Sequence, residues 1–473
     1  MSWSLALLIS EWIIRLVMVA VVPHRNKPVS AMAWLVIIMF EPWIGLILYI
    51  TIGENRLPMR RIDRHARLIK YFQDLITRFA DNPDLSSPEI DTGSLPVMNL
   101  ATSLGQMPIL GGNDVKLMSD TDEVIQSLIL DIDNAQKHVN LLFYIFAYDN
   151  TGQKVIEALE KAVERGVKCR VLVDSVGSRP LIKNQTKRFA KSGIEFRVAL
   201  PVNLLRRRLK RIDLRNHRKV AVIDGRIGYA GSQNIIDADY GRKNLIWQDM
   251  MARLTGPVVT ELQSIFLRDW YFEAKQILDD EDIFPEPEIK GEVPVQVLPS
   301  GPSFPTDNYQ RLVVAALYSA KEKVVITTPY FIPDEPFLQA IQVAVMRGAK
   351  VTIIVPEKYD QIFAGAASKA YYSHLLNAGV DLYLYQKGLL HTKSISIDSR
   401  IAFIGSSNFD IRSFELNFEV NLVFYHTPVT ISIERIQGEY ISESILLDSE
   451  TWKQRSFWRK IFQNIVKLFS PLL

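Results

Sequence analysis

The stretch HTKSISIDSRIAFIGSSN at residues 391–408 is matched, spacing for spacing, by HRKVAVIDGRIGYAGSQN at residues 217–234. Each copy has a histidine, a lysine two residues later, an aspartate five residues after the lysine, and a Gly-Ser pair followed by an asparagine. The recurring positions are His217, Lys219, Asp224, Gly231, Ser232 and Asn234 in the first copy and His391, Lys393, Asp398, Gly405, Ser406 and Asn408 in the second. Six matched positions in each half of the chain indicate an internal duplication.

The sequences on either side of the two copies also share a layout. Residues 122–146 and 308–331 each contain a helix-periodic run, a polar turn and a short apolar run. Residues 152–174 and 335–356 each contain an amphipathic helix, a glycine that ends it and a β-branched strand. Alternating helices and strands predict α/β layers, and the duplication predicts two similar lobes related by an approximate two-fold axis.

The chain of 473 residues is long enough for several domains. We expect a first lobe at 111–283 and a second lobe at 306–450, each with one copy of the motif. The proline-rich segment 284–305 should be extended and should link or edge the two lobes. A basic linker is expected at 56–110, and an amphipathic helix at 451–473.

Two apolar segments precede the lobes. Residues 5–22 and 31–53 each approach the ~20 apolar residues that a helix needs to cross a bilayer, so residues 1–55 are predicted to form a two-helix transmembrane hairpin. The bias of basic residues toward the cytoplasmic side then leaves the N-terminus and both lobes in the cytoplasm. The basic residues after the second segment are Arg56, Arg60, Arg61, Arg64, Arg67 and Lys70. The polar break at Glu41 and Pro42 leaves open a re-entrant or core hairpin instead.

The last predicted helix is amphipathic. One face carries Trp458, Ile461, Phe462, Ile465 and Phe469, while Arg459, Lys460 and Lys467 lie off that face. Such a helix can lie in a membrane interface or dock on the protein's own core, and the sequence leaves both possibilities open.

Composition limits the other functional classes. The net charge is only +3, so the chain is not basic throughout, and its one cysteine, Cys169, excludes an internal disulfide. Cys169 falls in an apolar strand and is expected to be buried packing. Basic residues gather between positions 206 and 219, where they form either a solvated face or a surface that attracts anionic lipid. They are Arg206, Arg207, Arg208, Lys210, Arg211, Arg215, Arg218 and Lys219.

The repeated motif suits chemistry on a phosphodiester. In a strand, residues i and i+2 face the same side, so each copy presents an imidazole beside an ammonium, followed by a small-residue loop whose donors can approach an anion. If the copies meet, one neutral histidine can attack phosphorus while the other donates a proton to the leaving alkoxide. The histidines lack close ligand spacing, and no carboxylate cluster surrounds them, so we expect no metal. Asp224 and Asp398 are expected to bond nearby backbone rather than substrate.

The duplicated motif resembles that of the phospholipase D superfamily. Further stretches are similar to the bacterial cardiolipin synthases of that superfamily: ILGGNDVKLMSD, FYIFAYDNTG, NHRKVAVIDGRIGYAGSQN, YFIPDEP and GSSNFDIRSFELNFEVNL. The resemblance covers nearly the whole chain. It implies two phospholipase D-like lobes that build one site working through a phosphohistidine.

The resemblance also implies a role for each residue. His217 would be the nucleophile and His391 the general acid and base. The catalytic set would also include Lys219, Lys393 and the motif aspartates Asp224 and Asp398. Phosphate oxygens would be held by the two lysines together with Ser232, Asn234, Ser406 and Asn408. Asp249 and Glu419 would each orient the histidine of the opposite lobe, although ordinary strand-edge carboxylates are the alternative.

The implied reaction transfers a phosphatidyl group from one phosphatidylglycerol to another, giving cardiolipin and glycerol. No cofactor and no nucleic-acid partner are implied; the partners are phosphatidylglycerol and anionic membrane lipid, and the expected location is the bacterial inner membrane. Phosphatidylserine synthesis and phospholipase D hydrolysis differ only in the acceptor. A nuclease that uses the basic run to follow a phosphate backbone, and a catalytically silent membrane scaffold, are more distant alternatives.

Overall fold

The computed structural model describes residues 3–26, 28–53, 90–201, 213–241, 245–278, 281–304 and 306–470. The basic residues at 56–70, and those at 206–211 in the basic run, lie outside the described residues.

The first lobe is an α/β unit whose elements alternate as the sequence predicts. Asp149 caps the helix at 150–164 by accepting a hydrogen bond from the Gly152 N–H, and Gly166, at φ +89°, follows its end. The elements are β1 (Leu110–Met118), α7 (Thr121–Asn134), β2 (His138–Phe143), α8 (Asn150–Glu164), β3 (Lys168–Asp174), α9 (Arg179–Ser192), β4 (Glu195–Ala199), β5 (Lys219–Ile223), β6 (Ile227–Gly231), β7 (Trp247–Gln248), β8 (Met251–Thr255) and α10 (Val258–Ala274).

The second lobe repeats this order. Asp334 caps the helix at 335–346, and Gly348 follows it at φ +95°, as Gly166 does in the first lobe. The elements are β9 (Val293–Ser300), α11 (Asn308–Ser319), β10 (Lys323–Thr327), β11 (Phe331–Ile332), α12 (Glu335–Met346), β12 (Lys350–Pro356), α13 (Ile362–Asn377), β13 (Asp381–Tyr385), β14 (Leu389–Leu390), β15 (Ser394–Ile397), β16 (Ile401–Gly405), β17 (Phe409–Asp410), α14 (Ile411–Glu415), β18 (Glu419–Phe424), α15 (Thr427–Ser442) and β19 (Ser444–Leu446).

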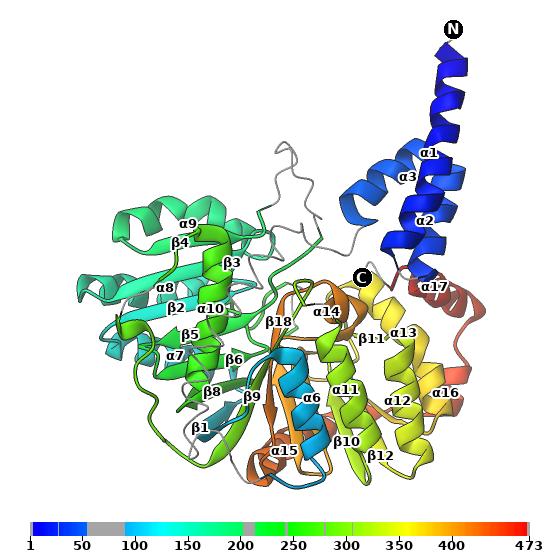
Figure 1. Cartoon of the computed structure of the whole chain (residues 1–473). Coiled ribbons are helices and arrows are strands. Elements are labelled where there is room, and N and C mark those ends of the chain that lie inside the picture. The colour runs from blue at the N-terminus through cyan, green and yellow to red at the C-terminus, as the bar shows by residue number, and fades with distance from the viewer. Residues whose placement is uncertain are drawn as a thin grey trace.

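Within the described residues, fifteen strands form one sheet that runs through both lobes. Its order is β19-β13-β12-β10-β15-β16-β18-β9-β1-β8-β6-β5-β2-β3-β4. Read outward from the β9–β1 pair, the strands of the two lobes follow equivalent sequences, with helices packed over the sheet in each lobe (Figure 1). The predicted α/β architecture with two similar lobes is therefore confirmed.

The proline-rich segment is more than a connection. Its residues 293–300 form β9, which pairs with β18 on one side and with β1 on the other. Val295 and Val297 of β9 are fully buried in a hydrophobic cluster that also contains Leu254 and Leu422, one from each lobe. The segment thus joins the two lobes through one shared core.

Part of the predicted linker at 56–110 also has a structural role. Residues Leu95–Gly105 form helix α6, which packs on α11 and β9 of the second lobe. Val97 and Ala101 are buried there in the core of the second lobe. The segment that precedes the first lobe therefore completes the second.

The N-terminal segments form α1 (Trp3–Arg25), α2 (Pro28–Phe40), α3 (Pro42–Leu48) and a π-helical turn (Tyr49–Gly53). In the described part of the chain, α1 is the one helix long and apolar enough to cross a membrane. The second predicted span is instead interrupted at Glu41, which has the non-helical dihedral angles φ −132° and ψ 84°. Pro42 explains the break, because its ring disfavours helical geometry at the preceding residue. Two helices that each span the membrane are therefore not confirmed.

The chain ends in two helices, α16 (Ser449–Lys453) and α17 (Phe457–Lys467), and α17 packs on α13. Cys169 is buried between the helices and sheet of the first lobe, as the sequence predicts.

Candidate active site

Each histidine of the repeated motif lies just before a strand, which begins at Lys219 in the first copy and directly after Lys393 in the second. Lys219 Nζ donates a hydrogen bond to the carbonyl of His217 (2.7 Å), and Lys393 Nζ donates to the carbonyl of His391 (2.5 Å). All four side chains are buried. The motif therefore holds each ammonium beside its own histidine, as the spacing of two residues predicts.

The histidines are bonded to carboxylates of the opposite lobes. His217 Nδ1 lies 3.0 Å from both carboxylate oxygens of Glu419. His391 Nδ1 lies 2.7 Å from Asp249 Oδ1. The cross-lobe contacts expected for Asp249 and Glu419 are thus present, and they bring the two motif copies to one place.

Two short parallel backbone contacts explain why these partners meet. The N–H of His391 donates to the carbonyl of Gln248 (2.8 Å), where β14 pairs with β7. The N–H of His217 donates to the carbonyl of Phe418 (2.9 Å) beside an equivalent bridge. Since Gln248 and Phe418 directly precede the two carboxylate residues, each backbone contact sets a carboxylate against the histidine of the other lobe.

The two motif serines bind the carboxylates. Ser232 Oγ donates to Asp249 Oδ1 (2.5 Å), and Ser406 Oγ donates to Glu419 Oε2. Both hydroxyls thus contact the carboxylates, and their binding of substrate phosphate stays a prediction. The preceding glycine is required by close packing, since a Cβ at position 231 would collide with the Met250 carbonyl.

The two motif asparagines are buried but are not bonded alike. Asn234 Oδ1 accepts a hydrogen bond from the Ile145 N–H (3.1 Å). Asn408 Nδ2 donates to Asp410 Oδ2 (3.0 Å), while its buried Oδ1 has no partner among the described residues. Each amide group keeps at least one N–H available for an anion.

The two motif aspartates lie away from the histidines, at the far ends of β5 and β15. Asp224 accepts hydrogen bonds of 2.8, 2.8 and 2.9 Å from the backbone N–H groups of residues 136–138, and Asp398 accepts equivalent bonds from residues 321–323. Both have positive φ, 52° and 50°. Their oxygens hold the adjacent strand of the sheet, in agreement with the backbone-bonding expectation, while their inclusion in the catalytic set stays a prediction.

Burial keeps both histidines neutral. It lowers the pKa of His217 to about 4 and that of His391 to about 3, with the nearby lysines acting in the same direction and the carboxylates opposing them. Against burial, the interactions with the histidines and the nearby lysine charges hold the pKa of Asp249 at about 2 and that of Glu419 below its usual value. An ionised carboxylate can only accept, so Nδ1 carries the imidazole proton and Nε2 keeps its lone pair.

Burial also lowers the pKa of the two lysines, to about 8 for Lys219 and about 7 for Lys393. The like charge of Lys219 lowers the pKa of Lys393 further. Two buried ammonium groups with weakened proton affinity are stabilised by a bound anion. The site is thus built for a negatively charged group between the two lysines.

Several residues of the site were missed in the sequence. The ring of Tyr144 contacts His217 edge-on, with centroids 4.8 Å apart, and Trp247 lies against His391 at 4.7 Å. Arg218 Nη1 donates to both carboxylate oxygens of Asp269 in a buried ion pair (2.7 and 2.8 Å), and Arg218 Nε donates to the Glu419 carbonyl.

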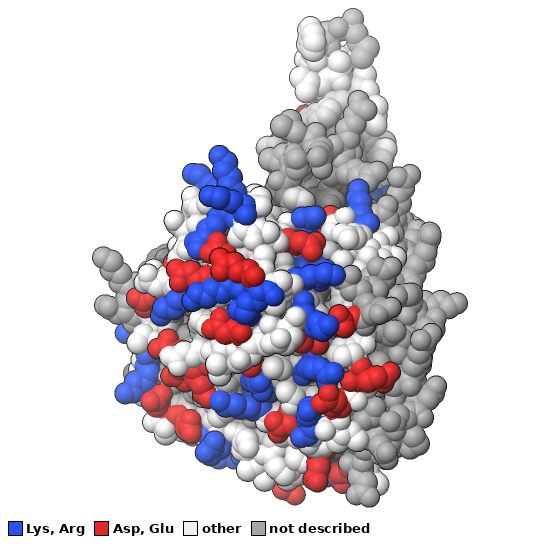
Figure 2. Space-filling view, turned by 90° about the vertical axis from the view of Figure 1, so that its left-hand side faces the viewer, with Lys and Arg blue, Asp and Glu red and all other residues white. Residues whose placement is uncertain are grey.

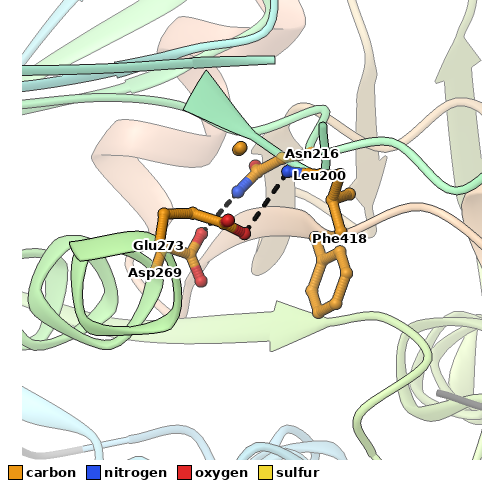
Figure 3. Close-up of a pocket in the computed structure, with 6 residues that line it drawn as sticks. Leu200, Asn216, Asp269, Glu273 and Phe418 are labelled. Carbon is orange, nitrogen blue, oxygen red and sulfur yellow. Dashed lines mark hydrogen bonds between the residues drawn. The ribbon is translucent and has the colours of Figure 1, made fainter. Parts of the chain in front are cut away.

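A small pocket lies beside this ion pair, where the two lobes meet. Figure 3 shows Asn216 bonded to Asp269, and Glu273 accepting a hydrogen bond from the Leu200 N–H. Phe418 closes the pocket from the second lobe. The pocket lies directly behind the His217–Glu419 pair. Two of its lining residues, Asn216 and Phe418, directly precede His217 and Glu419 in the chain.

No group of three or more His, Cys, Asp or Glu side chains in the described ranges is arranged to hold a metal ion. On the outer face of the first lobe, Lys and Arg side chains alternate with Asp and Glu (Figure 2). The described part of this face therefore presents no continuous basic track.

Comparison with known proteins places the chain in a family. A family model described as "Cardiolipin synthase, PLD-like domain" matches residues 128–270 and 313–439, and one described as "Phospholipase D-nuclease N-terminal" matches residues 12–54. Cardiolipin synthase A of Yersinia pseudotuberculosis serotype IB is 37% identical over 464 residues, which cover 95% of this chain and 94% of that protein. Cardiolipin synthase A of Yersinia pestis is 36% identical over 457 residues, with the same coverage of 95% and 94%.

Among solved structures, a phosphatidylserine synthase from Haemophilus influenzae Rd KW20 has the same fold. Its TM-score is 0.61 at 16% sequence identity, and the match covers 80% of this chain and 97% of that one. Both copies of the motif fall within the matched family model, and the curated relatives span nearly the whole chain. The chain therefore belongs to the cardiolipin synthase family of the phospholipase D superfamily.

Proposed function

We propose that the protein is a membrane-associated phosphatidyltransferase that converts two molecules of phosphatidylglycerol into cardiolipin and glycerol. The observation that carries this proposal is the pair of buried histidines, each with Nδ1 bonded to a carboxylate of the other lobe and both flanked by lysines. Whole-length similarity to cardiolipin synthases supports the choice of lipid substrate.

In the first half-reaction, His217 Nε2 attacks the phosphorus of one phosphatidylglycerol. The P–N bond forms as the bond from phosphorus to the glycerol oxygen breaks, and protonated His391 gives its Nε2 proton to that oxygen. Lys219, Lys393, Asn234 and Asn408 hold the phosphate oxygens, whose negative charge grows in the transition state. Glu419 stabilises the positive charge that develops on His217.

In the second half-reaction, the terminal hydroxyl of another phosphatidylglycerol attacks the same phosphorus. His391 Nε2 takes the hydroxyl proton, the P–N bond breaks, and cardiolipin leaves with His217 neutral again. His391 thus regains the proton that it donated in the first half-reaction. A bound phosphodiester opposes the effect of the two lysines on the histidines, and so raises the His391 pKa toward the value an acid needs.

Water competes with the lipid hydroxyl in the second step and would give phosphatidic acid. The phosphate-binding residues and both histidines are buried, which favours an acceptor delivered from the lipid phase over water. Asp249 and Glu419 then act as positioning residues, since each contacts substrate only through a histidine.

We further propose that the lobes face the cytoplasm of a bacterial cell. The apolar helix α1 and the exposed apolar side chains of α2 and α3 support insertion of residues 3–53 into the inner membrane. A hairpin that returns to its starting side keeps the lobes and the N-terminus together, in agreement with the basic residues that follow it.

The test uses purified protein in detergent with phosphatidylglycerol labelled in its glycerol headgroup and in its acyl chains. We expect release of one glycerol for each cardiolipin formed. Phosphatidic acid without cardiolipin would refute the transferase and indicate a hydrolase. Formation of phosphatidylserine when serine is added, with no cardiolipin in its absence, would indicate a different acceptor.

A further inference from the structure

Helix α17 is held on the second lobe by one flank, which contains both polar and apolar residues. Gln463 and Val466 are buried against the body, and Gln463 accepts a hydrogen bond from Arg455 Nη1 (2.9 Å). Lys467 Nζ lies 4.3 Å from the ring centroid of Tyr371 on α13. Docking through this flank fixes which side of α17 points away from the protein.

The side that points away is apolar. The exposed large hydrophobic residues are Phe457, Trp458, Phe462, Ile465, Leu468 and Phe469, with Trp458 75% exposed and Ile465 51% exposed. Four of the five residues of the predicted apolar face, Trp458, Phe462, Ile465 and Phe469, are in this set, and no described part of the chain covers them. An exposed apolar patch of this kind marks a contact with another apolar surface.

The position and charge of α17 identify that surface. Helix α13 beneath it packs on β11, which pairs with β17 directly after Asn408, so α17 lies at the active-site end of the second lobe. The helix contains Arg459, Lys460 and Lys467 and no acidic residue. In Figure 1, α17 also lies at the end of the body from which α1 projects, while α15 lies at the opposite end.

We propose that α17 lies in the interface of an anionic lipid bilayer, with its apolar face inserted and its basic residues near the headgroups. Because α17 is fixed to α13, this contact sets the active-site end of the second lobe against the membrane surface. The inference rests on the proposed function in one respect, namely that the substrate arrives from a bilayer. It adds a second membrane contact, separate in the chain from the N-terminal segments.

The full-length protein allows a direct test by site-specific labelling. Burial raises the pKa of the native Cys169 thiol to about 12, so a maleimide dye will label an introduced cysteine selectively. Ile465→Cys places the dye on α17. Ile431→Cys is the matched control, because Ile431 is also an exposed isoleucine on a helix, 52% exposed on α15.

Both labelled proteins are reconstituted in vesicles of phosphatidylglycerol and phosphatidylcholine that carry brominated acyl chains. We expect strong quenching of the dye at position 465, greatest for bromines near the headgroup end because interfacial helices insert only ~5–10 Å. The dye at position 431 should not be quenched. Equal quenching at both positions would overturn the proposal.

A second copy of the chain is the competing occupant of this face. It would shield the dye at position 465 from lipid quenchers and allow cysteines at that position to cross-link between molecules, a result that also overturns the proposal. As a functional readout, Ile465→Asp should lower turnover in vesicles several-fold relative to Ile431→Asp, with the unfolding midpoint unchanged. The quenching needs no turnover, so absence of cardiolipin synthesis would refute the proposed function and leave the membrane contact intact.

Discussion

His217 and His391 occupy equivalent positions in the two motif copies, yet the aromatic residues beside them are not equivalent. Tyr144 contacts His217, and Trp247 contacts His391, and both aromatic residues belong to the first lobe. The orienting acids also differ, a glutamate for one histidine and an aspartate for the other. These differences give the two histidines distinct surroundings, as distinct roles require.

Separate roles predict separate defects. With a phosphodiester whose leaving group is a phenolate, no acid is needed for departure, so His391→Asn should still form the phosphoenzyme. Its cardiolipin synthesis should fall by about 10²- to 10⁴-fold, the usual worth of acid and base catalysis. His217→Asn should form no phosphoenzyme. Labelled, alkali-stable phosphoprotein in His217→Asn, and none in His391→Asn, would reverse the assignment.

The lysines predict the pH dependence. Their ammonium groups attract the substrate when charged, and that charge is lost as the pH rises through about 7 for Lys393 and about 8 for Lys219. His217 is neutral, as a nucleophile must be, above about pH 4. We therefore expect kcat/KM in mixed micelles to fall on the alkaline side between these lysine values, and kcat to fall only at higher pH because bound phosphodiester raises both lysine pKa values.

An alkaline decline that is absent up to about pH 10, close to the ordinary lysine pKa, would contradict this account. A decline that begins at the same pH for kcat and kcat/KM would show that substrate does not contact the lysines.

Which residues matter could be predicted from the sequence, but their partners only in part. The duplicated spacing identifies the histidines, lysines and asparagines because local geometry fixes their relation along a strand. The partners of Ser232 and Ser406 could not be predicted, since the position of each carboxylate depends on a backbone contact with the other lobe. Tyr144 and Trp247 carry no motif of their own.

At the scale of elements, the two motif hairpins are each held by an aspartate at the turn. Asp224 accepts three backbone hydrogen bonds and has a left-handed φ of 52°, which aspartate tolerates better than alanine. Asp398 does the same in the second lobe. In both turns the aspartate therefore bonds to backbone, and it lies at the opposite end of its strand from the motif histidine.

Replacement of this aspartate should affect stability more than catalysis. Asp224→Ala removes the acceptor of three N–H groups and should lower the free energy of unfolding by about 1–3 kcal/mol. Thermal unfolding in detergent measures the loss, and kcat of the folded fraction should stay within about two-fold, well short of a lost catalytic group. Asp224→Asn is the control, because an amide oxygen still accepts and asparagine tolerates the left-handed φ. A large fall in kcat with unchanged stability would return Asp224 to the reacting groups.

Helices and strands were predicted correctly where the hydrophobic periodicity extends over many residues. The predictions failed where packing against other elements determines the local structure. Helices α8 and α12 have clear caps and amphipathic patterns, so sequence alone places them. Strand β9 lies in a proline-rich segment and exists because β1 and β18 offer free edges on either side of it. The second apolar segment has the composition of a span, but Pro42 interrupts its helix.

At the scale of the whole molecule, the active site depends on both halves of the chain. Glu419 serves His217, Asp249 serves His391, and α6 from before the first lobe packs into the second. Duplication was visible in the sequence, but this exchange of parts between the halves was not, because it depends on contacts more than 100 positions apart in the chain.

Membrane orientation is also tested on the whole molecule. The exposed His24 lies in the last turn of α1, so His24→Cys should react with an impermeant thiol reagent added outside intact cells. An exposed lobe position, Lys187→Cys on α9, should react only after the cells are opened. Labelling of both cysteines from the same side would contradict a hairpin that crosses the membrane.

The continuous sheet has a consequence for how lipid enters and leaves. Many two-lobed enzymes release product by swinging their lobes apart about a hinge. Here such a motion would break the β1–β9 ladder and expose the core that Val295 and Val297 share with both lobes. Product exchange must therefore proceed through local movement of the loops around the histidines, while the frame that aligns them stays closed throughout the catalytic cycle.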